Sequence, residues 1–113
     1  MKLLHSITAT LLLFSFFAIP AFAAKRASAK WGEELFKDPA FAGSKNEKSC
    51  FSCHENDKKM KKRLVDMPKE QMTKTINACI TKALQGEPLD EDSEEMRAMR
   101  MYFNLLADDC YGK

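Results

Sequence analysis

The sequence predicts an all-α domain of about three to four helices, and the spacing of its apolar residues carries that prediction. The clearest helix lies between Pro68 and Gly86, where apolar residues recur every three or four positions. A similar pattern runs from about Asp92 to Ala107 and predicts the last helix. No stretch shows the apolar–polar alternation that is typical of a half-buried strand. The 113 residues are therefore expected to form one small helical domain.

The first two predicted helices have recognisable ends. The first is short and ends near Phe36, because Asp38 and Pro39 follow it. Pro68 suits the first turn of the middle helix, and Gly86 suits its end. The apolar face predicted for the middle helix comprises Met72, Ile76, Cys79 and Ala83, widened by Ile80 and Leu84.

The last helix is predicted to begin with a capping box, in which Asp92 and Glu95 satisfy backbone groups of the first turn. Acidic side chains at this end also suit the positive pole of the helix dipole. The predicted buried stripe of this helix comprises Met96, Met99, Phe103 and Leu106.

Residues 1–23 are predicted to be an export signal that is removed from the mature protein. They combine a cationic start, an apolar stretch at Leu11–Ile19 and small residues at Ala21 and Ala23, which is the order found in secretory signals. An uncut membrane anchor is the alternative, but the apolar stretch is shorter than the ~20 residues of a spanning helix. Cleavage after Ala23 would leave residues 24–113 as the domain and place it in the periplasm without a membrane span.

Charge and size limit what the mature chain can do. The sequence holds 18 Lys and Arg residues against 16 Asp and Glu residues, and the signal removes Lys2, so the mature chain is nearly neutral. A nearly neutral exported protein lacks the electrostatic basis of nucleic-acid binding. A domain this small buries only a modest core and commonly needs a disulfide, a metal or a cofactor for stability.

The motif that carries chemistry is Cys50-Phe51-Ser52-Cys53-His54, a C-x-x-C-H sequence of the kind that attaches haem c. The spacing suits the reaction, because two thiols on one short turn can each add to a vinyl group of the same haem. His54 follows directly and can reach the iron as its proximal axial ligand. We therefore predict one covalent haem c, held by Cys50 and Cys53.

Two other uses of paired cysteines are the alternatives. A redox dithiol is normally placed in a βαβ unit, and this sequence shows no such pattern. A zinc site needs a second pair of ligands, and Cys79 and Cys110 are too far apart in sequence to form another C-x-x-C. Haem attachment therefore explains the motif best.

The motif and the helices around it resemble the class I cytochrome c fold. Gly32 and Phe36 resemble the Gly/aromatic pair of that family's N-terminal helix, and Tyr102 resembles the aromatic residue of its C-terminal helix. The resemblance covers Trp31 to about Leu106. It implies that the first and last helices cross in close contact, with Gly32 allowing the approach.

A narrower resemblance is to the haem domains of the thiosulfate dehydrogenases and of SoxA, a subunit of sulfur oxidation. The segments that carry it are Leu35-Phe36-Lys37-Asp38-Pro39, Ile76-Asn77-Ala78-Cys79-Ile80, Gln85-Gly86-Glu87-Pro88-Leu89 and Asp92-Ser93-Glu94-Glu95-Met96. In those families a cysteine at the place of Cys79 is the distal ligand of the haem iron. The resemblance implies the same role for Cys79. It also makes a small haem subunit or relative of a thiosulfate-oxidising or other sulfur-compound-oxidising enzyme an alternative function.

The residues themselves leave the sixth iron ligand open. Cys79 is the leading candidate, because it lies on the apolar face of the middle helix, and a thiolate there would favour ferric iron. Met60 and Met67 are alternatives, since Met/His ligation is common in electron-transfer cytochromes. A disulfide between Cys79 and Cys110 is a further alternative that an oxidising compartment would allow. A lysine ligand and an open sixth position are the remaining alternatives.

Two charged segments follow the C-x-x-C-H motif in the sequence. The basic cluster comprises Lys58, Lys59, Lys61, Lys62 and Arg63. The acidic segment lies between Glu87 and Glu95. Such runs are commonly only solvated faces. The functional interpretation is that the basic cluster surrounds the haem edge and steers an acidic redox partner, an effect that salt would weaken.

Together these observations predict a periplasmic monohaem cytochrome that carries single electrons between partner proteins. No pair of carboxylates and no nucleophile with a neighbouring base stands out, so catalysis by side chains is poorly supported. A haem sensor or gas-binding protein with an open or displaceable sixth site is a second alternative.

Overall fold

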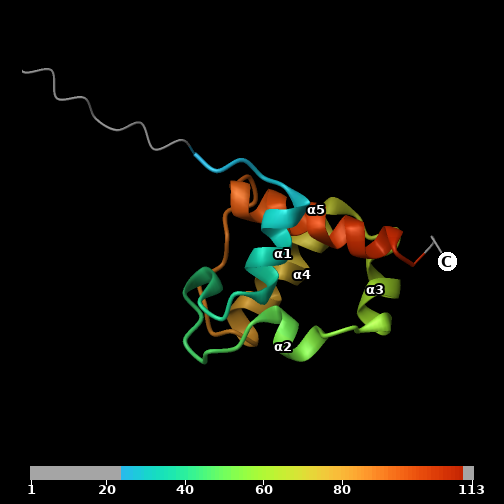
Figure 1. Ribbon diagram of the computed structural model, residues 1–113. Coiled ribbons are helices and arrows are strands. Elements are labelled where there is room, and N and C mark those ends of the chain that lie inside the picture. Colours follow the sequence, from blue (N-terminus) through green and yellow to red (C-terminus); the bar gives the residue numbers. More distant parts are fainter. Residues whose placement is uncertain (1–23, 111–113) are drawn as a thin grey trace, which may run out of the picture.

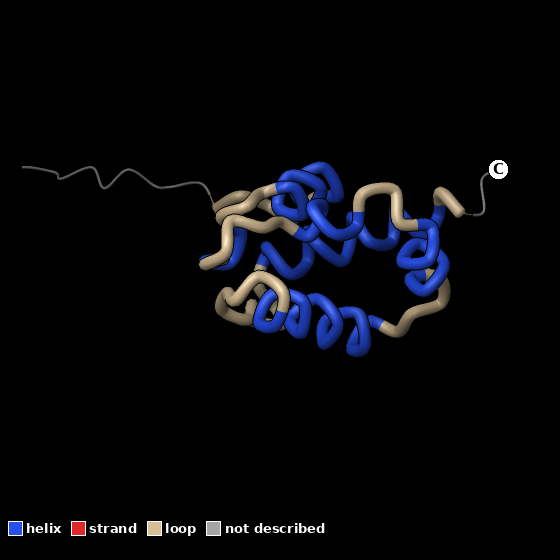
Figure 2. Tube along the Cα trace, turned by 90° about the horizontal axis from the view of Figure 1, so that it is seen from below, coloured by secondary structure: helices blue, strands red, loops and turns tan. Residues whose placement is uncertain are grey.

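The structure is a computed structural model that describes residues 24–110, so the predicted export signal at 1–23 lies outside the described residues. Residues 24–110 form five α-helices and one short 3-10 helix, and they contain no strand (Figure 1, Figure 2). The elements are α1 (Ala29–Lys37), η1 (Phe41–Gly43), α2 (Cys50–His54), α3 (Lys58–Leu64), α4 (Lys69–Lys82) and α5 (Glu94–Asp108). The all-α prediction is confirmed. Within the described range every helix is too short or too polar to span a lipid bilayer.

Helices α1 and α5 cross in close contact, as the cytochrome resemblance implied. A Cβ atom on Gly32 would overlap the carbonyl oxygen of Ala98 and would lie 2.7 Å from Cβ of Tyr102. The ring of Phe36 packs edge-on against Tyr102 and Phe103, with centroid distances of 5.4 and 5.9 Å. Glycine at position 32 therefore sets the separation of the two helices, and aromatic rings fill the space beside the crossing.

Helix α4 supplies a second wall of the core. It begins directly after Pro68, which is its N-cap residue and so lies one position before the first turn in which the sequence predicts it. Its buried residues are Met72, Thr73, Ile76 and Ile80. Cys79 is half-buried on the same helix. The prediction that Ala83 shares the buried face is wrong: the helix ends at Lys82, and Ala83 is its exposed C-cap residue.

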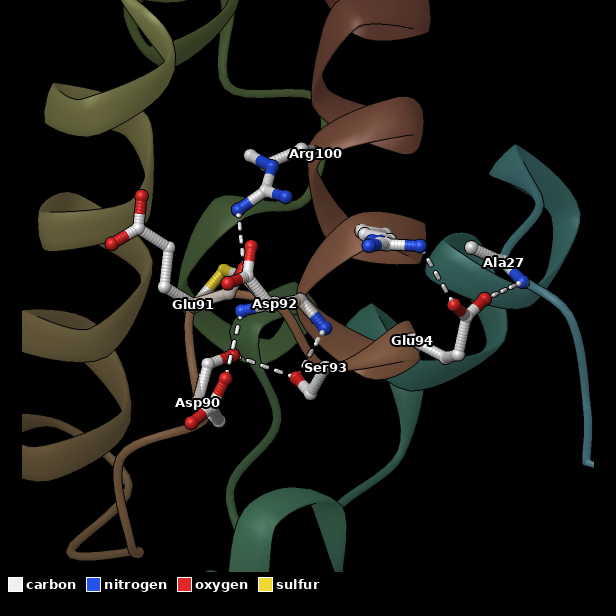
Figure 3. A network of polar contacts seen from close by, with 9 residues as sticks. Ala27, Asp90, Glu91, Asp92, Ser93, Glu94 and Arg100 are labelled. Atoms are coloured by element: carbon white, nitrogen blue, oxygen red, sulfur yellow. Dashed lines mark hydrogen bonds and ion pairs between the residues drawn. The ribbon is translucent and has the colours of Figure 1, made fainter.

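Helix α5 begins one residue later than the predicted capping box. The N-cap residue is Ser93, whose Oγ accepts a hydrogen bond from the backbone N–H of Met96 at 3.2 Å. Asp92 does not cap the helix, because its backbone N–H donates to the carboxylate of Asp90 at 2.8 Å and so belongs to the preceding turn (Figure 3). The predicted stripe is confirmed, since all four of its members are buried: Met96, Met99, Phe103 and Leu106.

The segment before α1 is fastened to the start of α5 (Figure 3). The backbone N–H of Ala27 donates to one carboxylate oxygen of Glu94 at 2.7 Å, and the other oxygen accepts from Arg97 at 3.0 Å. Arg100 donates to the backbone carbonyl of Glu91 at 3.0 Å and to the Thr73 hydroxyl at 2.9 Å. Part of the acidic segment therefore joins structural elements and is more than a solvated face.

Helix α3 is formed by the basic cluster, and the sequence pattern did not predict it. Its N-cap residue is Asp57, whose Oδ1 accepts from the backbone N–H of Met60 at 2.9 Å. Met60 and Leu64 lie one turn apart, and Leu64 is only 3% exposed. Two apolar residues among five basic ones are too few to show a helical period. The helix therefore depends on its cap and on packing against α5.

Candidate haem-binding site

The C-x-x-C-H motif forms α2, a single helical turn with a reciprocal cap. Oγ of Ser49 accepts from the backbone N–H of Ser52 at 3.2 Å, and Oγ of Ser52 accepts from the backbone N–H of Ser49 at 3.0 Å. This capping box closes the turn locally, and contacts with α1 and the burial of Cys50 anchor it to the rest of the domain. Cys50 is 5% exposed, Cys53 is exposed, and His54 is half-buried. The Cys50 thiol therefore lies in the core, and the Cys53 thiol lies at the surface.

An apolar cavity of about 260 Å³ lies next to this turn. Three of the four predicted site residues line it, namely Cys50, His54 and Cys79, whereas Cys53 does not. The apolar walls come from α1, α3, α4 and α5 and include Phe36, Leu64, Ile76, Met99 and Phe103. Residues as far apart in the sequence as Phe36 and Phe103 thus converge on one partly open cavity.

The residues considered for the sixth ligand position also converge here. Met60 and Met67 line the same cavity as Cys79, so all three named candidates face the space beside His54. The predicted alternative of a Cys79–Cys110 disulfide is wrong, because both cysteines are free thiols. Cys110 is exposed beyond the end of α5 and lines a different groove. Cys79 is therefore available to a ligand in the cavity.

The Cys50 and Cys79 thiols share one environment and ionise very unequally. The pKa of Cys79 is lowered to about 6, mainly by the hydrogen bond to the Cys50 side chain and to a smaller extent by the positive charge of His54. Burial of Cys79 acts in the opposite direction. The same contact with Cys79 and the burial of Cys50 raise the pKa of Cys50 well above its usual range. Cys79 is thus the thiol that becomes a thiolate, the form in which cysteine binds metals.

His54 is held by the residue that caps the next helix. Its Nδ1 lies 3.0 Å from Oδ2 of Asp57, and the two side chains are 35% and 30% exposed. The backbone N–H of Met60 and then the His54 side chain lower the pKa of Asp57. A pair this exposed adds little to folding stability, so its main physical effect is on the orientation of the imidazole.

The basic cluster borders the cavity on one side and a groove on the other. Lys59 and Arg63 line the cavity. Lys58, Lys61 and Lys62 line the groove of about 730 Å³ that also contains Cys110. Two of the five basic residues therefore lie at the cavity, and the other three lie along the separate groove.

Sequence reasoning missed Asp57 as a site residue. The signal was present, because an Asp three residues after the motif histidine and directly before a basic run fits an N-cap position. Without the helix in view, Asp57 reads as one more member of a polar stretch.

The donors at the cavity are those that a haem c site needs. An imidazole and a thiolate are both established axial ligands of haem iron, and two further thiols stand at the spacing of covalent attachment. The apolar walls suit a planar aromatic macrocycle. By contrast, the part of the chain that the structure describes holds no group of three or more His, Cys, Asp or Glu side chains suited to a bare metal ion.

A helical domain with a C-x-x-C-H turn facing an apolar cavity is the architecture of a cytochrome c domain. The sequence model of one such family, described as SoxA/TsdA, cytochrome c domain, matches residues 31–110, and the chain belongs to that family. No curated protein and no solved structure matched the chain. Membership implies a c-type haem and redox partners.

Proposed function

We propose that the protein is an exported electron carrier that holds one haem c through thioether bonds to Cys50 and Cys53. His54 is the proximal iron ligand, through its Nε2 atom. The observation that carries the proposal is the convergence of Cys50, His54 and Cys79 on one apolar cavity. Haem, when bound there, supplies a one-electron ferric/ferrous couple. The side chains around it exclude water from the iron and set its potential through ligation and polarity.

Cys79 is the proposed distal ligand. It lines the cavity from the last turn of α4, it is half-buried, and its thiol is free. A thiolate stabilises ferric iron and lowers the potential relative to a methionine ligand. Electron paramagnetic resonance of the ferric protein, compared with its Cys79→Ser variant, tests this role. An identical low-spin signal in the variant would reject Cys79 and leave Met60 or Met67 as the ligand.

The basic cluster on α3 is the proposed docking surface for an acidic redox partner. Support comes from Lys59 and Arg63 at the mouth of the cavity and from the three lysines along the adjoining groove. Electrostatic attraction of this kind raises association rates and is screened by salt. The proposed location is the periplasm, after cleavage of residues 1–23. Covalent attachment of haem and the export signal both fit that location.

The pyridine haemochrome spectrum of the purified holoprotein tests attachment. Its absorption maximum depends on how many vinyl groups have been converted to thioethers. We expect the position for two thioethers in the wild type and for one thioether in the Cys53→Ala variant. A wild-type spectrum that shows two intact vinyl groups would contradict the proposal.

A role in sulfur-compound oxidation is the second candidate, because the family includes SoxA and TsdA domains and the pKa of the Cys79 thiol lies below its usual value. Thiosulfate-dependent reduction of the haem, measured for the wild type and for Cys79→Ala, separates this activity from simple electron transfer. Turnover that disappears in the variant would establish it, and a wild type without turnover would exclude it. Carbon monoxide binding to the ferrous protein would instead indicate a displaceable sixth ligand and a sensor.

A further inference from the structure

Asp57 is the only carboxylate at the cavity among the described residues, and both of its oxygens have fixed partners. Oδ1 accepts the backbone N–H of Met60 at 2.9 Å and so caps α3. Oδ2 lies 3.0 Å from Nδ1 of His54. The carboxylate cannot turn away from the imidazole without giving up the cap. The side chain therefore joins α2 to α3 through the proposed iron ligand.

The direction of the His54–Asp57 hydrogen bond follows from the role of the other ring nitrogen. If Nε2 presents its lone pair to iron, the proton of the neutral imidazole must reside on Nδ1. Nδ1–H then donates to Oδ2 of Asp57. A carboxylate acceptor forms a shorter and stronger hydrogen bond than a neutral carbonyl does. It also draws the proton away from the ring and makes Nε2 more basic.

We propose that Asp57 is a positioning residue that fixes the ring of His54 and lowers the midpoint potential of the haem by strengthening the electron donation of Nε2. This inference rests on the proposed function, since it takes His54 as the proximal ligand. A more basic imidazole stabilises ferric iron more than ferrous iron. The proposed Cys79 thiolate acts in the same direction from the other face, so both axial positions of the site favour the oxidised state.

The cap explains how an exposed carboxylate can hold a ligand. Asp57 and His54 are each about one-third exposed, and a free pair at such a surface would be mobile. The start of α3 supplies the restraint, because the backbone N–H of Met60 fixes one oxygen. Met60 itself lines the cavity, so the cap and the wall belong to the same turn of helix.

Two variants and one control test the inference. Asp57→Asn offers one acceptor oxygen where Asp57 offers two and removes the negative charge. Asp57→Ser keeps a good N-cap residue, but its hydroxyl is too short to cap and reach His54 together. Asp90→Asn is the matched control: its carboxylate also accepts a backbone N–H, from Asp92 at 2.8 Å, but it lies outside the cavity.

The readouts are the midpoint potential and the proton NMR spectrum of the ferric holoprotein. We expect both Asp57 variants to raise the potential, and a tenfold change in relative ferric affinity corresponds to about 59 mV for this one-electron couple. We also expect the His54 Nδ1–H proton to exchange with solvent roughly tenfold faster or more in the variants, because a charge-assisted hydrogen bond is lost. Asp90→Asn should change neither quantity.

The outcomes separate this inference from the proposed function. A holoprotein with haem attached, but with Asp57 variants that match Asp90→Asn in potential and in proton exchange, would overturn the role of Asp57 alone. A wild-type protein that carries no haem after maturation would overturn the proposed function and this inference together. Should Asp57→Asn fail to fold, Asp57→Ser retains the cap and gives the same two readouts.

Discussion

The α1–α5 crossing and the α2–α3 region of the same small domain are built on different physical principles. At the crossing, Gly32, Phe36 and Tyr102 fill all the space between two helices. In the α2–α3 region, two short capped helices border a cavity, and the Cys50 and Cys79 thiols that line it have opposite pKa shifts. The crossing is closely packed, whereas the second region leaves a cavity for the proposed cofactor. The two regions meet at Phe36, which packs against Tyr102 in the crossing and also lines the cavity, so the crossing supports one wall of the proposed cofactor site.

The strongest way to break the comparison is to overpack the crossing. Gly32→Ala puts a Cβ atom onto the carbonyl of Ala98, so the helices must separate. We expect a loss of about 3 kcal/mol in the free energy of unfolding, at the upper end of overpacking effects. Chemical denaturation of the holoprotein measures it.

The control for the crossing is Gly43→Ala in η1. A Cβ atom there meets no atom within 4 Å, but the residue has a φ of 70°, so strain alone should cost roughly 1 kcal/mol. Equal losses for the two variants would contradict the packing argument.

The next largest effect is expected at the cavity, on the midpoint potential of the haem. Cys79→Met exchanges the proposed thiolate for a neutral thioether and leaves the crossing untouched. We expect the midpoint potential to rise by at least ~60 mV, which is a tenfold change in the relative affinity for the two oxidation states. The free energy of unfolding should change much less than for Gly32→Ala. A potential that stays at the wild-type value would show that Cys79 does not bind iron.

A third test lowers the pH, which should protonate the Cys79 thiolate at the cavity and leave the α1–α5 crossing unchanged. The pKa of Cys79 lies below its usual value, at about 6, so the thiolate prevails above that pH and is lost as the pH falls through it. With haem bound as proposed, iron would take the place of the Cys50 thiol in stabilising the thiolate. Ligation should therefore persist to pH 6 or lower.

The absorption spectrum of the ferric protein, recorded from pH 8 to pH 4, follows this change. We expect a loss of the low-spin bands at the acid end of that range in the wild type. Cys79→Met is the control, because a thioether does not titrate. A wild-type transition that lies well above pH 6 would contradict thiolate ligation.

The smallest expected effect concerns the surface of the α2–α3 region. Replacing Lys61 and Lys62 by Gln removes two charges from the groove beside the cavity. We expect a several-fold slower electron transfer to an acidic partner at low salt and nearly wild-type rates at high salt. Lys30→Gln, in α1, removes an exposed charge elsewhere and should leave the rate unchanged. Stopped-flow kinetics at several salt concentrations measures the rates of the wild type, the Lys61 and Lys62 variant and Lys30→Gln. Equal slowing by Lys30→Gln would contradict the proposed docking surface.

The crossing was predictable from sequence because its determinants are single residues at fixed spacing. Gly32 and Phe36 lie one turn apart, and the stripe from Met96 to Leu106 has a clear helical period. The start of α5 was missed by one residue, since the side chain of Asp90 draws Asp92 into a turn. That competition between neighbouring caps is local, but composition alone does not resolve it.

The cavity was only partly predictable, because it depends on contacts between distant segments. The C-x-x-C-H motif identifies Cys50 and His54, and the periodicity of α4 directs Cys79 inward. The apolar pattern does not indicate α3, and its one local signal is Asp57, whose side chain caps the helix and also lies against the imidazole. For the same reason, sequence spacing could not choose among Cys79, Met60 and Met67, all of which the fold brings to one space.

The mass of the intact protein is the most direct measurement of the central claim, that haem is bound covalently by the α2 turn. The protein is matured in a host with a haem c attachment system, and its mass is recorded under denaturing conditions that release any non-covalent cofactor. The account predicts the mass of residues 24–113 plus one haem, and the loss of that added mass when Cys50 and Cys53 are both replaced by Ala. A wild-type mass equal to that of the bare polypeptide would contradict it.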